Sequence, residues 1–461
     1  MNKQVLALAV ASVAATGCSD SSDRLAPEPA VAASPASSLT VRSIAAPEGV
    51  AGSMGELRFP VFMDQTQAED VIVHYETIDG EARSDSDYLA SAGEVVIPAG
   101  SLGTEIVVEL LGDGDIEAAE TIELRYRVEG NATATSESAK GTIANDDSAC
   151  DSPYDKNPNP WLLREGANPL NYAHRGGVTD FPENTLYAYY EVAKAGADVL
   201  ELDVFQTADN ELVVRHDQEV DRTTNGSGFI VDLTLAELQA LDAAYWFVQD
   251  QRTPRDAAEE DYEFRGIATG DKPPPPGYRA EDFRIPTLEE VLQAFPAELI
   301  NIDLKIDLDG EGEYERQIAD LLQRYGRSSD VIAASFVDEA LNNFKAAAPC
   351  VHTSVPLNEA AALILGSLGP DNPLPDVPAH VAFQIPRNTS SVQQVDIELE
   401  VLTEDLVADA HAANLAVHVW TINTCEDMLE VIAFGVDAIM TDEPILLEEL
   451  LNTPPDERSC D

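Results

Sequence analysis

The sequence predicts two folded domains, an antiparallel β-sandwich over residues 38–148 and a (β/α)8 TIM barrel of the α/β class over residues 149–461. In the first region, short strand-like runs are separated by Gly and Asp turns, and several alternate apolar with polar residues, which is typical of a sandwich. In the second region, eight short apolar runs alternate for the most part with helical stretches, as in a barrel. A chain of 461 residues is long enough for both.

The predicted strands are short in both domains. Those of the sandwich include residues 57–61, 71–75, 94–97, 105–109, 122–126 and 141–143. Those of the barrel are Asn171–His174, Val199–Val204, Leu299–Lys305, Val331–Phe336, Val351–Val355, Val381–Ile385, Val417–Thr421 and Val436–Thr441. Helices are predicted at Thr185–Ala195, Leu288–Phe295 and Tyr314–Tyr325.

One further strand-like run, Leu212–Arg215, does not fit the count of eight. The connection from Val204 is too short for a helical crossover, so a hairpin is predicted. Because the loop is short and its turn lies near Asp209, the hairpin places His216 level with Asp203.

The N-terminal sequence predicts an export signal followed by a linker. Lys3 precedes the apolar run Val5–Ala15, which is too short to span a bilayer. The following Thr16-Gly17-Cys18 resembles the lipobox of bacterial lipoproteins, although Ala15 stands where Leu is usual. We expect residues 1–18 to be a lipoprotein-type signal peptide and Cys18 to carry the lipid, which anchors the protein in the bacterial cell envelope, at the periplasm or cell surface. Ordinary secretion with another cleavage site is the alternative. Residues 19–37, rich in Ser, Ala and Pro, are expected to be a flexible tether.

The charge balance excludes one class of function. Asp and Glu number 84 against 27 Lys and Arg, a formal charge of −57. A basic face for nucleic acid is therefore excluded. Such acidity suits a salty environment or a protein that binds several calcium ions. A solvated acidic surface explains most of it.

Four cysteines remain besides Cys18, and in an exported chain an even number favours disulfides. Cys150 and Cys460 lie at the two ends of the second domain, and domain ends often lie close together. We therefore favour Cys150–Cys460, which leaves Cys350–Cys425. The alternative is four free buried thiols.

Polar residues stand where the predicted barrel strands end, at the rim where barrel active sites form. They are His174, Arg175, Glu201, Asp203, Asp303, Lys305, Trp420 and Asp442, together with His216 after the hairpin. The two-residue period of a strand places Glu201 and Asp203 on one face. Three acids suit a hard divalent ion such as Mg²⁺ or Ca²⁺. An internal salt-bridge network with Arg175 and Lys305 is the alternative.

The first domain resembles a Calx-β domain over roughly residues 38–148. The motifs that carry the resemblance are Pro47-Glu48-Gly49, Tyr75-Glu76-Thr77 with Asp79-Gly80, Ser86-Asp87-Tyr88, Glu117 with Glu120, and Asn145-Asp146-Asp147. The resemblance implies calcium at one end of the sandwich, with the candidate ligands Glu48, Asp87, Asp113, Glu117, Glu120, Asp146 and Asp147. The alternative is that these are turn-forming acids on an acidic surface.

The second domain is similar to the glycerophosphodiester phosphodiesterase family over about residues 170–451. The motifs include Tyr172-Ala173-His174-Arg175-Gly176-Gly177, Pro182-Glu183-Asn184-Thr185, Glu201-Leu202-Asp203-Val204, His216-Asp217, Arg222-Thr223-Thr224, Asn301-Ile302-Asp303-Leu304-Lys305, Trp420-Thr421-Ile422-Asn423 and Thr441-Asp442. Many motifs recur in order, so the resemblance is specific.

The resemblance implies a role for each matching residue. His174 and His216 would be the general acid/base pair, Glu201, Asp203 and Asp303 the metal ligands, and Arg175 and Lys305 the phosphate clamp. Glu183 would orient Arg175, and Trp420 would pack against glycerol. Many members have Glu where this chain has Asp303. The stretch Val248–Asp282, with its run Pro273–Pro276, looks like an enlarged rim.

The implied activity is metal-dependent hydrolysis of glycerophosphodiesters to glycerol 3-phosphate and an alcohol. Water and the neighbouring glycerol hydroxyl both remain open as the nucleophile. Two other functions stay open. One is a phospholipase D-like hydrolase of lysophospholipids or sphingolipids, and the other is a calcium-binding surface module with an inactive barrel.

Overall fold

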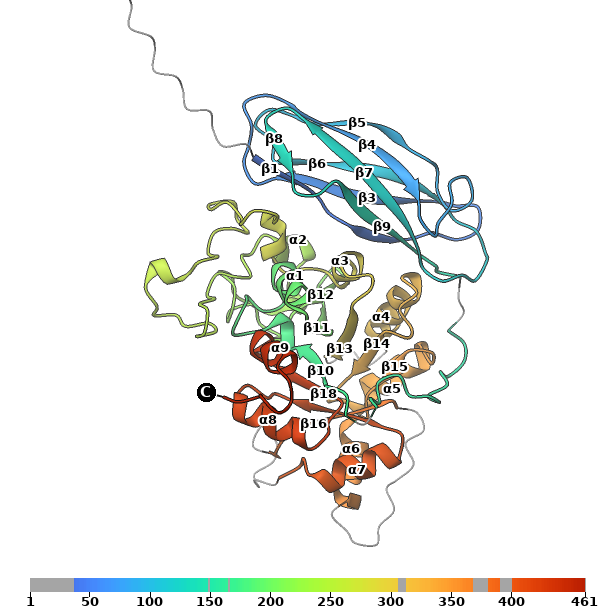
Figure 1. Cartoon of the computed structure of the whole chain (residues 1–461), viewed down its shortest axis with the longest axis vertical. Helices are drawn as coiled ribbons and strands as arrows, with labels where there is room; N and C mark the ends of the chain where they lie inside the picture. The colour runs from blue at the N-terminus through green and yellow to red at the C-terminus, as the bar shows by residue number, and fades with distance from the viewer. Residues whose placement is uncertain are drawn as a thin grey trace, which may run out of the picture. The chain divides into compact units, whose positions relative to one another are not determined.

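The computed structural model describes residues 37–147, 150–164, 166–305, 312–367, 380–389 and 400–460. The predicted signal peptide, the lipid-bearing Cys18 and the tether up to residue 36 lie outside the described residues. Figure 1 shows a β-rich N-terminal domain in blue and cyan, and a C-terminal domain from green to red in which helices surround strands.

The N-terminal domain is a sandwich of two sheets. Its strands are β1 (Ser37–Val41), β2 (Ile44–Pro47), β3 (Met54–Met63), β4 (Val71–Asp79), β5 (Ala92–Ile97), β6 (Gly103–Leu111), β7 (Glu120–Glu129), β8 (Ala132–Ala134) and β9 (Ser138–Ala144). One sheet has the order β6-β3-β1-β8 and the other β2-β9-β7-β4-β5. Most pairs are antiparallel as predicted, but β1 with β8 and β2 with β9 are parallel. The sequence did not predict β1, β2 and β8, which are short and weakly patterned.

The C-terminal domain is an eight-stranded parallel barrel, as predicted. Its strands are β10 (Leu170–Ala173), β11 (Val199–Gln206), β13 (Leu299–Leu304), β14 (Val331–Ala334), β15 (His352–Thr353), β16 (Ala382–Pro386), β17 (Ala416–Trp420) and β18 (Ala438–Thr441). They follow the order β15-β14-β13-β11-β10-β18-β17-β16. A parallel bridge between Ser354 and Ala382 joins the two ends of that order. The rim residues of neighbouring strands are therefore held side by side.

Helices surround this barrel. They are α1 (Leu186–Ala195), α2 (Leu235–Gln239), α3 (Leu288–Ala294), α4 (Glu313–Arg324), α5 (Asp338–Ala347), α6 (Leu357–Ser367), α7 (Glu404–Ala412), α8 (Cys425–Ala433) and α9 (Pro444–Asn452). The three predicted helices are confirmed as α1, α3 and α4. Thr287 caps α3 with its side chain, and Glu290 returns the bond to the Thr287 backbone, so a capping box fixes where this helix begins.

The predicted hairpin is confirmed. Strand β12 (Leu212–Val214) pairs antiparallel with β11, with Val204 opposite Val214. The Arg215 amide donates a 2.8 Å hydrogen bond to the Asp203 carbonyl. The next residue, His216, therefore starts beside the acids of β11, as the loop length required.

The long stretch 248–282 has an apolar core of its own. Its Phe264 and Tyr278 are buried with Phe283 against Tyr187 of α1. The Tyr187 and Phe283 rings stack with centroids 4.5 Å apart. This stretch is thus a packed extension of the barrel on the outside of α1.

The predicted disulfide pairing is wrong. Cys150 pairs with Cys350, and Cys425 pairs with Cys460. Cys350 precedes β15, whereas Cys425 begins α8 after the end of β17. Because all the barrel strands are parallel, these positions belong to opposite ends of the barrel, and Cys350 cannot reach Cys425. The end of the chain is tied to α8 and does not return to Cys150.

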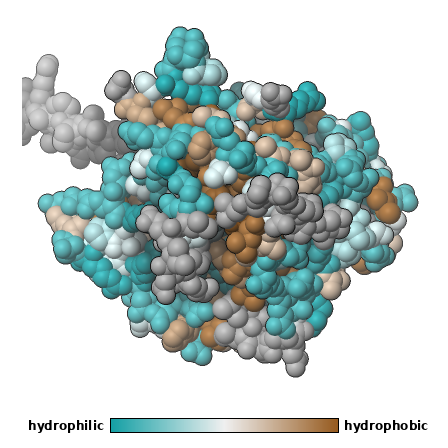
Figure 2. All heavy atoms as spheres, turned by 90° about the horizontal axis from the view of Figure 1, so that it is seen from below, coloured by the Kyte–Doolittle hydropathy of each residue, from teal (hydrophilic) through white to brown (hydrophobic). Residues whose placement is uncertain are grey.

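The surface view in Figure 2 shows one largely polar face. The face in Figure 2 is mostly hydrophilic, with apolar residues gathered in a few patches. Across the part of the chain that the structure describes, no helix combines the length and apolarity that crossing a bilayer requires.

Candidate active site

The first strand of the barrel delivers two functional side chains through a tight turn. After β10, His174–Gly176 form one turn of 3-10 helix in which Arg175 has a φ of 54°. That left-handed conformation is uncommon for a residue with a Cβ and is characteristic of functional sites. Gly177 follows at φ 85°, and a Cβ there would lie 2.9 Å from Pro444. The turn therefore requires glycine and places His174 and Arg175 together at the rim.

His174 is held in a defined orientation. Its Nδ1 lies 2.6 Å from Asp442 Oδ1, and Arg175 Nε donates to its Nε2 over 3.2 Å. Burial and the neighbouring Arg175 charge lower the pKa of His174. The imidazole is thus neutral near pH 7, with its Nδ1–H donating to Asp442 and its Nε2 lone pair accepting from Arg175 Nε. This is the state that a general base requires.

His216 has a matching arrangement beside the acids of β11. Its Nδ1 lies 2.7 Å from Asp217 Oδ1, and its side chain is 34% exposed. Each histidine thus has a carboxylate at Nδ1, so Nε2 is the nitrogen placed for chemistry, and in His174 it accepts a hydrogen bond from Arg175 Nε. The sequence placed Asp217 and Asp442 in motifs but assigned them no role. For Asp442 no local signature exists, because the histidine it bonds to lies 268 residues away along the chain.

The three predicted metal ligands lie on the neighbouring strands β11 and β13, where two of them pair with cations of the chain. The Arg175 amide donates to Glu201 over 2.8 Å. Lys305 Nζ lies 2.6 Å from Asp203 and 2.5 Å from Asp303. The salt-bridge network considered as the alternative is therefore present. Among the described residues, these carboxylate oxygens do not converge on one point.

The electrostatics of these acids differ. Burial and the neighbouring Asp203 raise the pKa of Glu201 well above its ordinary range. Burial alone would raise the pKa of Asp203 too, but Lys305 and Arg175 hold it below its ordinary value. Burial also raises the pKa of Asp303, against the attraction of Lys305. The cluster is therefore short of positive charge at Glu201.

The loop before α1 supports the site from one side. Asn184, at φ 55°, directs its Nδ2 to Asp203 over 3.5 Å, and its Oδ1 accepts from the Tyr189 hydroxyl. Glu183 lies 3.6 Å from Arg175, as its predicted role requires. Its shorter bonds go to Arg222, at 2.6 and 2.7 Å. Arg222 was not predicted as a site residue.

Trp420 ends β17 at the rim, as predicted. The Phe336 ring, after β14, meets it edge-on with centroids 5.5 Å apart. Phe336 is 51% exposed. The two rings form an apolar wall that suits an uncharged portion of a ligand.

The sandwich gathers six of its seven predicted calcium ligands into two groups. Their carboxylate oxygens converge within 4.8 Å, in the groups Glu48 with Asp113 and Asp147, and Asp87 with Glu117 and Glu120. Asp146 stands outside both groups, and its Oδ1 is buried without a partner. Partial burial and the bond to Asp87 raise the pKa of Glu120 to about 7. Carboxylates held this close repel one another, and a bound cation would relieve that repulsion.

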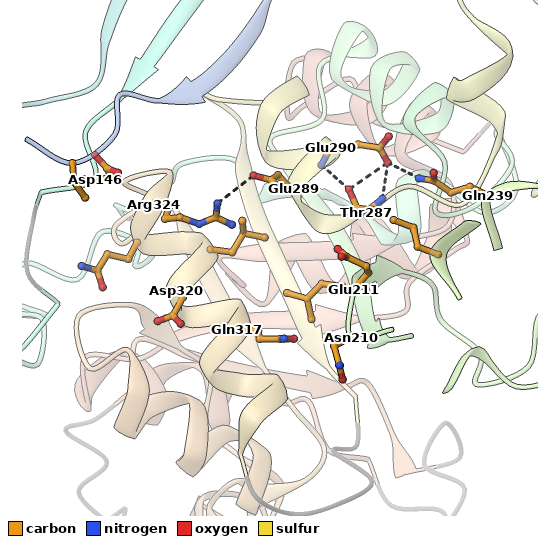
Figure 3. A pocket seen from close by; sticks show the side chains of 15 residues that line it. Asp146, Asn210, Glu211, Gln239, Thr287, Glu289, Glu290, Gln317, Asp320 and Arg324 are labelled. Carbon is orange, nitrogen blue, oxygen red and sulfur yellow. Dashed lines mark hydrogen bonds and ion pairs between the residues drawn. The ribbon is translucent and has the colours of Figure 1, made fainter. Parts of the chain in front are cut away.

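A large cavity lies away from the catalytic rim. Its volume is about 850 Å³, and barrel residues of the β11–β12 turn, α3 and α4 line much of it, among them Glu211, Glu289 and Gln317 (Figure 3). Arg324 pairs with Glu289 at 3.6 Å across it. No candidate catalytic or metal residue of the barrel lines this cavity. Size alone therefore does not locate the chemistry.

Residues 174–446 match the glycerophosphoryl diester phosphodiesterase family, and residues 43–147 match the Calx-beta domain. The chain belongs to the glycerophosphoryl diester phosphodiesterase family. A glycerophosphodiester phosphodiesterase of Caldanaerobacter subterraneus is 32% identical over 61% of this chain and 96% of its own length. One from Bacillus subtilis is 30% identical over 61% and 86% of the two chains. A human lysophospholipase D is 26% identical over 61% and 85%.

Members of this family generally depend on a divalent metal, and the site fits one. Glu201 and Asp203 are buried and Asp303 is partly buried on two neighbouring strands, and among the described residues no ion pair joins Glu201 to a side-chain cation. Oxygen donors of this kind are those that Mg²⁺ and Ca²⁺ prefer. Glu201, Asp203 and Asp303 would hold the metal.

Proposed function

We propose that this protein hydrolyses glycerophosphodiesters to glycerol 3-phosphate and an alcohol. The observation that carries the proposal is the pair of histidines, each with Nδ1 on a carboxylate, at the rim that also holds three acids, Arg175 and Lys305. Two neighbouring proton carriers and two cations suit displacement at a phosphodiester anion. Membership of the family supports the same reaction.

In the proposed mechanism His174 is the base and His216 the acid. Arg175 and Lys305 bind the phosphate oxygens and hold the phosphorus between the two imidazoles. The nucleophile's proton passes to His174 Nε2 as its oxygen bonds to phosphorus. The bond from phosphorus to the alcohol oxygen breaks, and that oxygen takes a proton from His216. A divalent metal, Mg²⁺ or Ca²⁺, held by Glu201, Asp203 and Asp303 would polarise the phosphate oxygens and offset their charge.

Purified protein with Mg²⁺ or Ca²⁺ is expected to release glycerol 3-phosphate from glycerophosphocholine. An enzyme-coupled assay for glycerol 3-phosphate measures this directly, and a panel with glycerophosphoethanolamine and glycerophosphoinositol gives the head-group preference. Turnover of none of these with either metal would contradict the proposal. If the sandwich still bound calcium, the result would favour the other hypothesis, a calcium-binding surface module with an inactive barrel.

The apolar wall favours a second candidate substrate class, the lysophospholipids. Phe336 is half exposed beside Trp420, and exposed aromatic surface at a polar rim suits a lipid chain. The human relative is named for such an activity. Lysophosphatidylcholine belongs in the same panel, and Phe336→Ala should lower its hydrolysis while sparing glycerophosphocholine. Equal loss on both substrates would argue against a lipid-binding wall.

The two acidic groups of the sandwich support binding of calcium in that domain. Calcium would be held by hard carboxylate oxygens and would relieve the repulsion that raises the pKa of Glu120 to about 7. Calcium is expected to raise the melting temperature of the sandwich, and Asp87→Asn to reduce that increase. A calcium titration by calorimetry in both forms tests it, and identical titrations would contradict it.

We also propose that the protein is exported and anchored to the bacterial cell envelope by a lipid on Cys18. The support is the sequence Thr16-Gly17-Cys18 after a short apolar run. Cys18→Ala should move the protein from the membrane fraction to the soluble fraction of cells. An unchanged distribution would remove the anchor.

A further inference from the structure

We infer that Arg222 is a positioning residue that holds the acid histidine and the phosphate clamp in register. The inference rests on the proposed function, since it concerns the same reaction. Arg222 lies in the loop after the hairpin and is followed by Thr223 and Thr224.

One guanidinium joins two carboxylates that serve different catalytic groups. Arg222 Nε donates to Asp217 Oδ2 over 2.5 Å, and Asp217 Oδ1 holds His216 Nδ1 at 2.7 Å. The two terminal nitrogens of Arg222 donate to the two oxygens of Glu183. Glu183 in turn lies 3.6 Å from Arg175 of the phosphate clamp. The chain of contacts thus runs from His216 to Arg175 through Arg222.

The shape of the guanidinium makes this link rigid. Its nitrogens are fixed in one plane, so a bidentate bond to Glu183 also sets the direction of the Nε bond to Asp217. A lysine ammonium is a point charge on a flexible stem and cannot fix both carboxylates at once. Both acids stay ionised in this arrangement. Although burial opposes it, Arg222 and Arg175 lower the pKa of Glu183 to about 2.

The surrounding loop is built to present Arg222. The Thr224 hydroxyl donates to the Val220 carbonyl over 2.7 Å, which closes the turn around Arg222. The fully buried Arg215 donates to Thr223 Oγ1 and to the Val220 carbonyl. Arg215 thus holds the loop that carries Arg222 in place. Arg222 is left to bond Asp217 and Glu183.

The orientation of His216 should matter according to the leaving group. An alcohol such as choline leaves as a strongly basic alkoxide and needs a proton from a correctly aligned acid. p-Nitrophenolate is a weak base and leaves without that proton. Loss of Arg222 should therefore harm the first reaction far more than the second.

The test compares glycerophosphocholine with glycerol 3-(p-nitrophenyl) phosphate. We expect Arg222→Gln and Arg222→Lys each to lower kcat for glycerophosphocholine by about a hundredfold, and for the p-nitrophenyl ester by less than about tenfold. Introduced into His216→Gln protein, Arg222→Gln should add only the smaller loss expected for the p-nitrophenyl ester, because the effect through His216 is already absent and only the effect through Arg175 remains. Arg284→Gln is the control, since Arg284 pairs with Glu290 on the outer wall of the barrel.

The p-nitrophenyl ester also reports whether each variant is folded. An equal loss on both esters, or full activity of Arg222→Lys, would overturn the inference while the proposed function stood. Wild-type protein inactive on both esters would instead reject the proposed function itself.

Discussion

His174→Ala should lower kcat for glycerophosphocholine by about a thousandfold or more, which is the upper part of the range for loss of a general base. The imidazole is neutral because burial and Arg175 lower its pKa, and its Nδ1 is fixed on Asp442. Alanine removes the Nε2 atom that, in the proposed mechanism, accepts the nucleophile's proton. Initial rates of glycerol 3-phosphate formation at saturating substrate measure the loss.

His74→Ala is the matched control for that experiment. His74 belongs to the sandwich and not to the barrel, and it pairs with Glu129 at 3.0 Å. Its replacement should leave kcat unchanged. The base assignment would be wrong if His174→Ala retained more than about a tenth of the activity, since a general base contributes at least about a hundredfold.

Removal of the metal should stop turnover altogether. Treatment with EDTA is expected to reduce glycerol 3-phosphate formation to background, and added Mg²⁺ or Ca²⁺ to restore it. Glu201→Gln should lower activity by about a thousandfold, because the amide keeps the volume but loses the charge that binds the cation. Rates over a metal titration in both proteins measure the effect.

The electrostatics of Glu201 add a pH dependence to this prediction. Burial and Asp203 raise its pKa, so in metal-free protein it binds a proton more readily than an ordinary carboxyl group. Protons and metal then compete, and the metal concentration for half-maximal activity should rise as pH falls. Glu290→Gln, a change on the outer wall near Arg284, is the control. Full activity in EDTA would contradict the role of the acids.

The sequence predicted the barrel because each strand appears as a local apolar run that can be recognised without knowledge of its neighbours. Several apolar runs carry polar residues toward their carboxyl ends, so the positions of Glu201, Asp203 and Asp303 followed from the strand period and the strand ends. The position of His216 followed for a similarly local reason, since a short loop allows only an antiparallel return of the chain. Local pattern was enough for the eight barrel strands and for the acids they carry.

Contacts between distant segments could not be predicted in the same way. Asp442 reaches His174 because β18 pairs with β10, and Arg222 reaches Glu183 because two loops meet at the rim. Neither depends on spacing along the chain. The prediction of the disulfide pairing was wrong for the same reason, because the choice between pairings depends on which end of the barrel each cysteine occupies.

The most direct test of this account follows glycerophosphocholine by phosphorus NMR with purified protein and Mg²⁺ or Ca²⁺, beside His174→Ala. The account predicts that the diester signal is replaced by that of glycerol 3-phosphate in the wild-type sample only, and that EDTA prevents the change. A diester signal that persists with both metals, or that disappears equally in His174→Ala, would contradict it.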